Sequence, residues 1–160
     1  FKPIMIITMK PSMFNINDVY YCKPIRNKIM NGGLFMRIIY SNNIVSINGI
    51  HIVFSIPGKI NEVYNNKYKF IFDNNYDTPR FINKIKEIEN NILSNCDIND
   101  KTPTYKLRDQ LDQNFFKFFQ STHGSKTQVK TNNPVSFSIK ISGIWTTDTS
   151  YGITYKFTKV

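Results

Sequence analysis

The stretch that decides the fold is FSIKISGIWTTDTSYGITYKF, residues 137–157. Apolar residues alternate with serine and lysine before its polar middle, and the period of two returns afterwards. This alternation predicts two strands, each with one apolar face, joined by a turn over residues 146–152. Gly143 breaks the alternation, which indicates a β-bulge or a close backbone approach. Trp145, the only tryptophan, lies near the turn, where it can either cap a barrel end or stack on a ligand.

The first half of the chain also has the composition of strands. Runs of β-branched and aromatic residues predict strands at residues 18–23, 34–40, 44–56 and 66–73. Within residues 44–56, Asn48-Gly49 predicts a two-residue type I′ hairpin, and Pro57-Gly58 is expected to end its second arm.

The period changes after residue 77. Thr78 is a candidate N-cap, Pro79 suits the first helical position, and apolar residues follow at helical spacing, which predicts an amphipathic helix of about four turns. Residues 105–120 fit both a helix and a strand, because FFKFF suits either, and the spacing of Leu107 and Leu111 favours a helix.

This order of elements predicts a mainly β protein that also contains α-helix. We expect an OB-fold-like Greek-key barrel with one or two helices inserted before the C-terminal hairpin, and other α+β arrangements stay open. An OB-fold places its helix between the third and fourth barrel strands. We expect a single domain over residues 1–160, and a start at Phe1 rather than Met indicates a missing N-terminal piece.

The formal net charge of +10 makes a polyanion the first partner to consider, with nucleic acid ahead of an acidic membrane surface. The chain is also rich in Asn, Ile and Lys, as expected from an AT-rich coding sequence. The positions of the lysines therefore matter more than their number.

Several classes of function lack their sequence signals. The two cysteines and two histidines show no metal-ligand spacing, and we expect Cys22 and Cys96 to be reduced, buried thiols. No hydrolase or nucleotide-binding motif is present, so neither an enzyme nor a cofactor is expected. No apolar run approaches the roughly 18 residues of a membrane span.

Aromatic and basic residues are interleaved in three predicted strands. Proteins that bind single-stranded nucleic acid combine a positive groove with aromatic side chains on which bases stack. The alternative is that the aromatics fill the core while the lysines face solvent. The candidate binding residues are Tyr20, Lys23, Arg26, Lys28, Arg37, Tyr40, Lys140, Trp145, Tyr155 and Lys156.

The segment ISGIWTTDTSYGITYKF resembles a C-terminal signature, GIW-x6-G-x-T-Y-K-F, of phage-type OB-fold single-stranded-DNA-binding proteins of nucleocytoplasmic large DNA viruses. The matching positions run from Gly143 to Phe157. A second, less specific match is YYCKPIRNK, which is similar to an early loop of the family. The chain departs from the family in two places. It ends in KFTKV, so the family's acidic tail is either absent or lies in a C-terminal extension, and it has only SIPGK where the family is proline-rich.

The resemblance implies non-catalytic binding of single-stranded DNA in viral replication, recombination or repair. The lysines and arginines among the candidates would neutralise phosphates, and some of the aromatics would stack bases. It also implies a homodimer, replication proteins as further partners and a viral replication site in the host cytoplasm or nucleus. A capsid-associated virion protein that reuses the fold, with capsid proteins as partners, stays open as the alternative.

Overall fold

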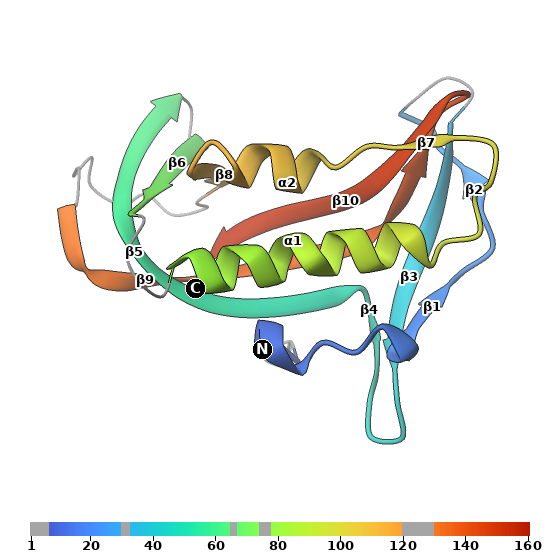
Figure 1. The fold of residues 1–160 in the computed structure, drawn as a ribbon, viewed down its shortest axis with the longest axis horizontal. Helices are drawn as coiled ribbons and strands as arrows, with labels where there is room; N and C mark the ends of the chain where they lie inside the picture. The colour runs from blue at the N-terminus through green and yellow to red at the C-terminus, as the bar shows by residue number, and fades with distance from the viewer. Residues whose placement is uncertain (1–6, 30–32, 65–66, 74–77, 120–129) are drawn as a thin grey trace, which may run out of the picture.

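The structure, a computed structural model, describes residues 7–29, 33–64, 67–73, 78–119 and 130–160 (Figure 1). Within these residues the strands are β1 (Val19–Tyr21), β2 (Ile25–Arg26), β3 (Leu34–Ser41), β4 (Ser46–Asn48), β5 (Ile50–Tyr64), β6 (Lys67–Phe72), β7 (Thr102–Pro103), β8 (Phe115–Phe119), β9 (Lys130–Thr146) and β10 (Ser150–Lys159). The helices are α1 (Thr78–Ser94) and α2 (Lys106–Leu111), preceded by the short 3-10 helices η1 (Pro11–Met13) and η2 (Ile16–Asp18).

Strands β5, β6, β8, β9 and β10 close into a barrel. Each pairs with the next around the ring, in the order β9-β5-β6-β8-β10, and β10 pairs with β9 to complete it. Only the contact between β8 and β10 is parallel among these pairings. If the five strands are numbered along the chain, the ring runs 1-2-3-5-4-1, which is the order of an OB-fold barrel. The predicted fold class is therefore confirmed.

Each of the five barrel strands contributes at least one buried phenylalanine to a central cluster, and β6 and β8 bury a second one each, Phe72 and Phe118. The central cluster contains Phe54, Phe70, Phe116, Phe137 and Phe157, all at most 4% exposed. The ring centroids of Phe116 and Phe157 lie 4.1 Å apart, and those of Phe70 and Phe137 lie 4.7 Å apart. Burying large aromatic rings is strongly favourable, so this cluster favours a closed barrel over an open sheet.

Strands outside the ring extend the sheet at both ends of the pairing path. Strand β3 pairs with β9, and β1, β2 and β4 pair in turn with β3. Strand β7 pairs with the start of β10. In Figure 1 these strands lie on the right, away from the part of the barrel formed by β5, β6 and β8.

Helices α1 and α2 lie side by side across the curved sheet (Figure 1). The predicted apolar face of α1 is confirmed, because Ile85, Ile88 and Ile92 are each at most 1% exposed. Both helices come between β6 and β8, the second and third barrel strands. They precede the C-terminal hairpin as predicted, but not at the position between the third and fourth strands that we expected of an OB-fold.

The predicted hairpin at Asn48-Gly49 is wrong. Asn48 pairs with Ile39 of β3, and the reversal lies earlier, where the Asn42 side chain accepts hydrogen bonds from the backbone N–H groups of Ile44 and Val45. Gly49, with a φ of 77°, instead joins β4, which pairs with β3, to β5, which pairs with β9. The chain therefore reverses direction at the turn that the Asn42 side chain stabilises, and not at Asn48-Gly49.

Two further boundaries differ from the prediction. Strand β5 does not end at Pro57-Gly58, since Gly58 pairs with Phe72 of β6. On its other side, the pairing of β5 with β9 shifts register between Ile56 and Gly58, at the proline. The helix predicted over residues 105–120 ends at Leu111, and FFKFF forms strand β8. The C-terminal hairpin is confirmed, with a shorter turn than expected between Thr146 and Ser150.

Candidate nucleic-acid interface

Strand alternation places a row of basic residues on the outside of the barrel. Lys140 of β9 pairs with His51 of β5 on one side and with Lys156 of β10 on the other. Paired residues point to the same face, with Cα atoms about 4.5–5.5 Å apart. Because Ile139 and Ile141 point inward and are fully buried, Lys140 points outward.

A second row continues this line on the far side of the ring. Lys69 of β6 pairs with Lys117 of β8. In the parallel contact Phe157 lies opposite Phe118, so Lys156 and Lys117, each one residue earlier, are neighbours across the two strands. We call Lys69, Lys117, Lys156 and Lys140 the basic belt, because they follow one another around the outside of the barrel.

Two lysines of the basic belt, Lys117 and Lys140, carry locally unbalanced positive charge. Like charges directly opposite one another on neighbouring strands destabilise a sheet. Among the residues that the structure describes, neither Lys117 nor Lys140 forms an ion pair. Partial burial and the charge of Lys140 lower the pKa of His51 below its ordinary value, which keeps this neighbour neutral at pH 7. The belt therefore presents a positive surface suited to a polyanion.

Two aromatic rings lie over glycines on the outside of the sheet, beyond the belt. Phe35 of β3 pairs with Trp145 of β9, so both rings share the outer face. A Cβ atom added to Gly143 would lie 2.7 Å from Cζ of Phe35, and one added to Gly152 would lie 2.6 Å from Cζ2 of Trp145. The two glycines of the C-terminal stretch therefore make room for the rings.

Arg37 completes this second cluster. It pairs with Gly143, directly beside the ring of Phe35, and its side chain is exposed. We call Phe35, Arg37 and Trp145 the aromatic platform. Lys140 and Trp145 lie five residues apart on β9, which corresponds to roughly 15 Å along a strand. Strict alternation over five residues would put the two side chains on opposite faces. The bulge between Ile141 and Gly143 adds one residue, so the platform and the basic belt lie on the same outer face of β9.

Trp145 does not fill the end of the barrel. It is half-buried, and its indole Nε1–H donates a hydrogen bond to the carbonyl oxygen of Ile153 at 3.2 Å. The ring lies over Gly152, with the Lys106 ammonium 4.6 Å from a ring centroid. Of the two predicted positions, the structure supports the one on the outer surface.

The remaining candidates on β1 and around β2 fall on different sides of the sheet. Tyr20 pairs with Ile39 and is 57% exposed, on the same face of β3 as Arg37. Arg26 pairs with Leu34, which places it on the opposite face from the aromatic platform. Lys23 and Lys28 are exposed in the segments on either side of β2.

Base stacking does not fit Tyr40. It shares the inner face of β3 with Ile38 and is 4% exposed. Its hydroxyl oxygen accepts a hydrogen bond from the backbone N–H of Asn15 at 3.1 Å, and burial raises its pKa.

Base stacking does not fit Tyr155 either. Beyond the bulge at Gly143, its side chain lies on the side of β10 that faces α2. Its hydroxyl donates a hydrogen bond to Oε1 of Gln110 at 2.8 Å, and its ring packs against Phe157. Burial, with the nearby Glu89 and Asp109 charges, raises its pKa to about 12.

Sequence reasoning missed four residues of this surface: Phe35, Lys69, Lys106 and Lys117. Lys117 was missed because FFKFF was predicted as a helix. If that run is a strand with Phe116 and Phe118 inside, alternation places Lys117 on the outer face. Lys69 alternates with Tyr68 and Phe70 in the sequence, and its ammonium lies 3.9 Å from the centroid of the Phe115 ring. No local pattern in the sequence marks Lys106, because its position beside Trp145 depends on where α2 packs.

Other kinds of site find less support in the described ranges. These ranges hold no group of three or more His, Cys, Asp and Glu side chains that could bind a metal. Cys22 is half-buried and Cys96 buried, both as free thiols. Neither helix seen here is long and apolar enough to cross a membrane. Comparison with protein-family models, with curated proteins and with solved structures found no match to this chain.

Proposed function

We propose that this protein binds single-stranded DNA, without catalysis, along the outside of its barrel. The observation that carries the proposal is the basic belt, in which Lys69 faces Lys117 and Lys140 faces Lys156. These like charges repel one another, and a phosphate backbone lying across the strands would relieve that repulsion. Neutralising phosphates releases counterions, which makes such binding favourable and dependent on salt.

The aromatic platform favours a single strand over a duplex. Bases that are not paired can stack on aromatic rings, and each such contact contributes about 1–3 kcal/mol. The ring of Phe35 lies over Gly143, the residue that pairs with the exposed Arg37, whose guanidinium can meet the phosphate of a stacked nucleotide. Tyr20, exposed on the same face, extends the platform onto β1.

The resemblance of residues 143–157 to viral single-strand binders supports a role in viral DNA replication, recombination or repair. That role would place the protein at a viral replication site in the host cytoplasm or nucleus, as a homodimer with replication proteins as partners. The OB-fold order of the barrel is compatible with this role, but a fold alone does not imply a function.

Titration of fluorescein-labelled oligo-dT, followed by anisotropy at several salt concentrations, tests the proposal. If the four belt lysines and Arg37 each contact a phosphate, the logarithm of the affinity should fall with the logarithm of salt with a slope of about −3 to −4. Replacing Lys117 and Lys140 together by alanine should make that slope shallower by about 1.4.

Lys10→Ala with Lys84→Ala provides the matched control. It removes the same charge from exposed or half-buried lysines outside the belt, so the slope should stay close to that of the wild type. Folded protein that shows no salt-dependent binding would overturn the proposal and favour the capsid-associated alternative. An equal loss in the control pair would show that net charge, rather than the belt, determines affinity.

A further inference from the structure

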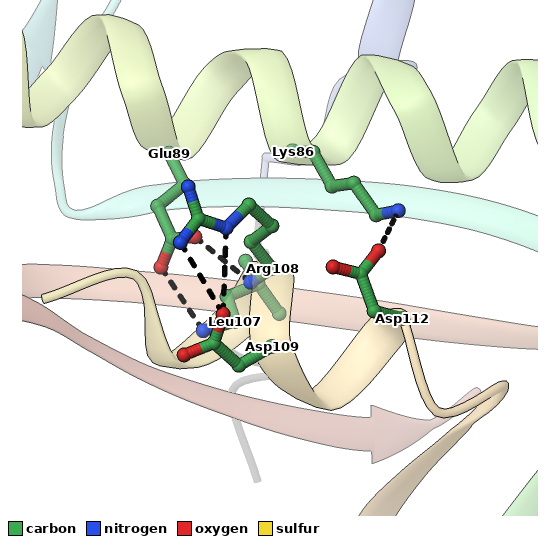
Figure 2. Close-up of polar contacts among 6 residues, drawn as sticks. All are labelled: Lys86, Glu89, Leu107, Arg108, Asp109 and Asp112. Atoms are coloured by element: carbon green, nitrogen blue, oxygen red, sulfur yellow. Dashed lines mark hydrogen bonds and ion pairs between the residues drawn. The ribbon is translucent and has the colours of Figure 1, made fainter.

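Helix α2 is held in place by a buried carboxylate from another helix. The Oε2 atom of Glu89, on α1, accepts a hydrogen bond from the backbone N–H of Leu107 at 3.0 Å, and Oε1 accepts one from Arg108 at 2.8 Å (Figure 2). Tyr105, at the N-cap of α2, makes no capping bond with its own side chain. Glu89 therefore satisfies two N–H groups that would otherwise lack a partner at the start of the helix.

These two bonds determine where α2 begins. A helix of six residues is too short to be stable in isolation, so its position depends on tertiary contacts. Glu89 is fully buried, and a buried carboxylate is tolerated only where hydrogen bonds compensate for its lost hydration. Because both oxygens are used, the bonds orient the first turn of α2 as well as anchoring it.

The far end of α2 is tied down independently. The hydroxyl of Tyr155 donates to Gln110 at 2.8 Å, and Lys86 of α1 forms an ion pair with Asp112 (Figure 2). Leu107 and Leu111 bury the apolar side of the helix. The helix is therefore fixed at both ends, and its first residue has a defined position.

That first residue is Lys106, which reaches the aromatic platform. Its side chain is exposed, and its ammonium lies over the ring of Trp145, 4.6 Å from the centroid. Trp145 is itself fixed by its bond to Ile153 and by its seat on Gly152. An ammonium at this position lies next to a surface where a stacked nucleotide would carry its phosphate.

We infer that Lys106 is a further nucleic-acid contact and that the buried Glu89 is its positioning residue. The inference rests on the proposed function, and it assigns to α1 and α2 a part in forming the outer surface of the barrel. A phosphate can draw the ammonium away from the ring, since an ion pair with hydrogen bonds competes well with a cation–π contact.

Lys106→Met is the first test, in the oligo-dT titration. It should weaken binding about fivefold to tenfold near 50 mM salt and make the salt slope shallower by about 0.7. Lys84→Met makes the same substitution at a half-buried lysine of α1 that lies outside the belt and pairs with Glu87, and it should leave both values unchanged. The emission of Trp145 in the free protein should also change with Lys106→Met, because the charge over its ring is lost.

Glu89→Gln, combined with Lys106→Met in a double-mutant cycle, tests the positioning role. Glutamine preserves the shape but offers one acceptor oxygen and turns an amide donor toward the other N–H. Alone, it should weaken binding about as much as Lys106→Met. In the Lys106→Met background it should have no further effect, because Glu89 acts through that lysine.

A second variant serves if Glu89→Gln does not fold. Tyr155→Phe removes the bond to Gln110 and loosens α2 from its other end, and the same non-additivity with Lys106→Met is expected. Binding by Lys106→Met equal to wild type, or additive losses in either cycle, would overturn the inference while the basic belt could still bind. If the wild type does not bind oligo-dT at all, the proposed function and the inference both fail.

Discussion

The absence of a Cβ atom at two positions allows aromatic rings to lie on the surface of this barrel. At Gly143 a Cβ would lie 2.2 Å from the carbonyl oxygen of Met36, and at Gly152 it would lie 2.9 Å from that of Thr104. The close approach predicted for Gly143 is confirmed, as is the bulge, seen as a register shift opposite Thr154 and Tyr155. Gly152 likewise leaves room for a neighbouring ring and a backbone carbonyl, although no break in the alternation of the sequence marks it.

Glu89 should give the stability an unusual dependence on pH. Burial raises the pKa of its carboxyl above the ordinary value of 4.5, although bonds from Arg108 and Leu107 and the Arg108 charge oppose the shift. A carboxyl with a raised folded pKa costs stability while it is ionised, and that cost disappears as pH falls through the folded pKa. The free energy of unfolding of the wild type should therefore rise relative to that of Glu89→Gln between pH 7 and pH 4.

Urea denaturation of both proteins at the two pH values measures this difference. Glutamine does not titrate, so the contributions of other groups cancel between the two proteins. A difference that moves in favour of Glu89→Gln as pH falls would show that the two backbone bonds outweigh burial and that the folded pKa is lowered.

Strand β8 shows how tertiary pairing decides an ambiguous element. The run FFKFF fits both periods, so its local pattern cannot choose between helix and strand. In the barrel, β6 pairs with it on one side and β10 on the other, and Phe116 and Phe118 fill the interior. A helix at this place would leave the ring open between β6 and β10.

Adjacent phenylalanines in β8 should therefore tolerate truncation very differently. Phe116 is fully buried and stacks on Phe157, so Phe116→Ala should lower the free energy of unfolding by about 3–5 kcal/mol. Phe115 is half-buried and points outward beneath Lys69, so Phe115→Ala should cost less than about 1.5 kcal/mol. Chemical denaturation of the two variants checks this, and similar losses would contradict the alternation assigned to β8.

Across the whole molecule, part of the excess positive charge behind the net +10 is carried by the lysines of the basic belt around the barrel. Stability and binding should conflict there, because the lysine pairs that attract a polyanion also repel each other. A substitution that removes the repulsion should therefore improve folding while it weakens binding.

Lys117→Glu makes that substitution, opposite Lys69 and beside Lys156. It should raise the free energy of unfolding by up to about 1 kcal/mol at low salt, with the gain fading as salt rises, and it should weaken oligo-dT binding. Lys10→Glu makes the same change of charge outside the belt and should alter neither value by as much. A destabilised Lys117→Glu protein would contradict the arrangement of the belt.

The sequence by itself determined most of the long strands other than β8, the main helix, the C-terminal hairpin and the faces of these strands, because these depend on patterns between near neighbours. It also predicted the barrel class and several exposed basic residues. Tertiary structure alone decided which strands meet, and so brought Lys117 beside Lys156 and Phe35 beside Trp145. Tertiary packing also keeps Tyr40 and Tyr155 off the outer surface. It places Lys106 over Trp145 at the start of α2, where Glu89 of α1 accepts a hydrogen bond from the backbone N–H of Arg108. These contacts join residues far apart in the chain, and no local period records them.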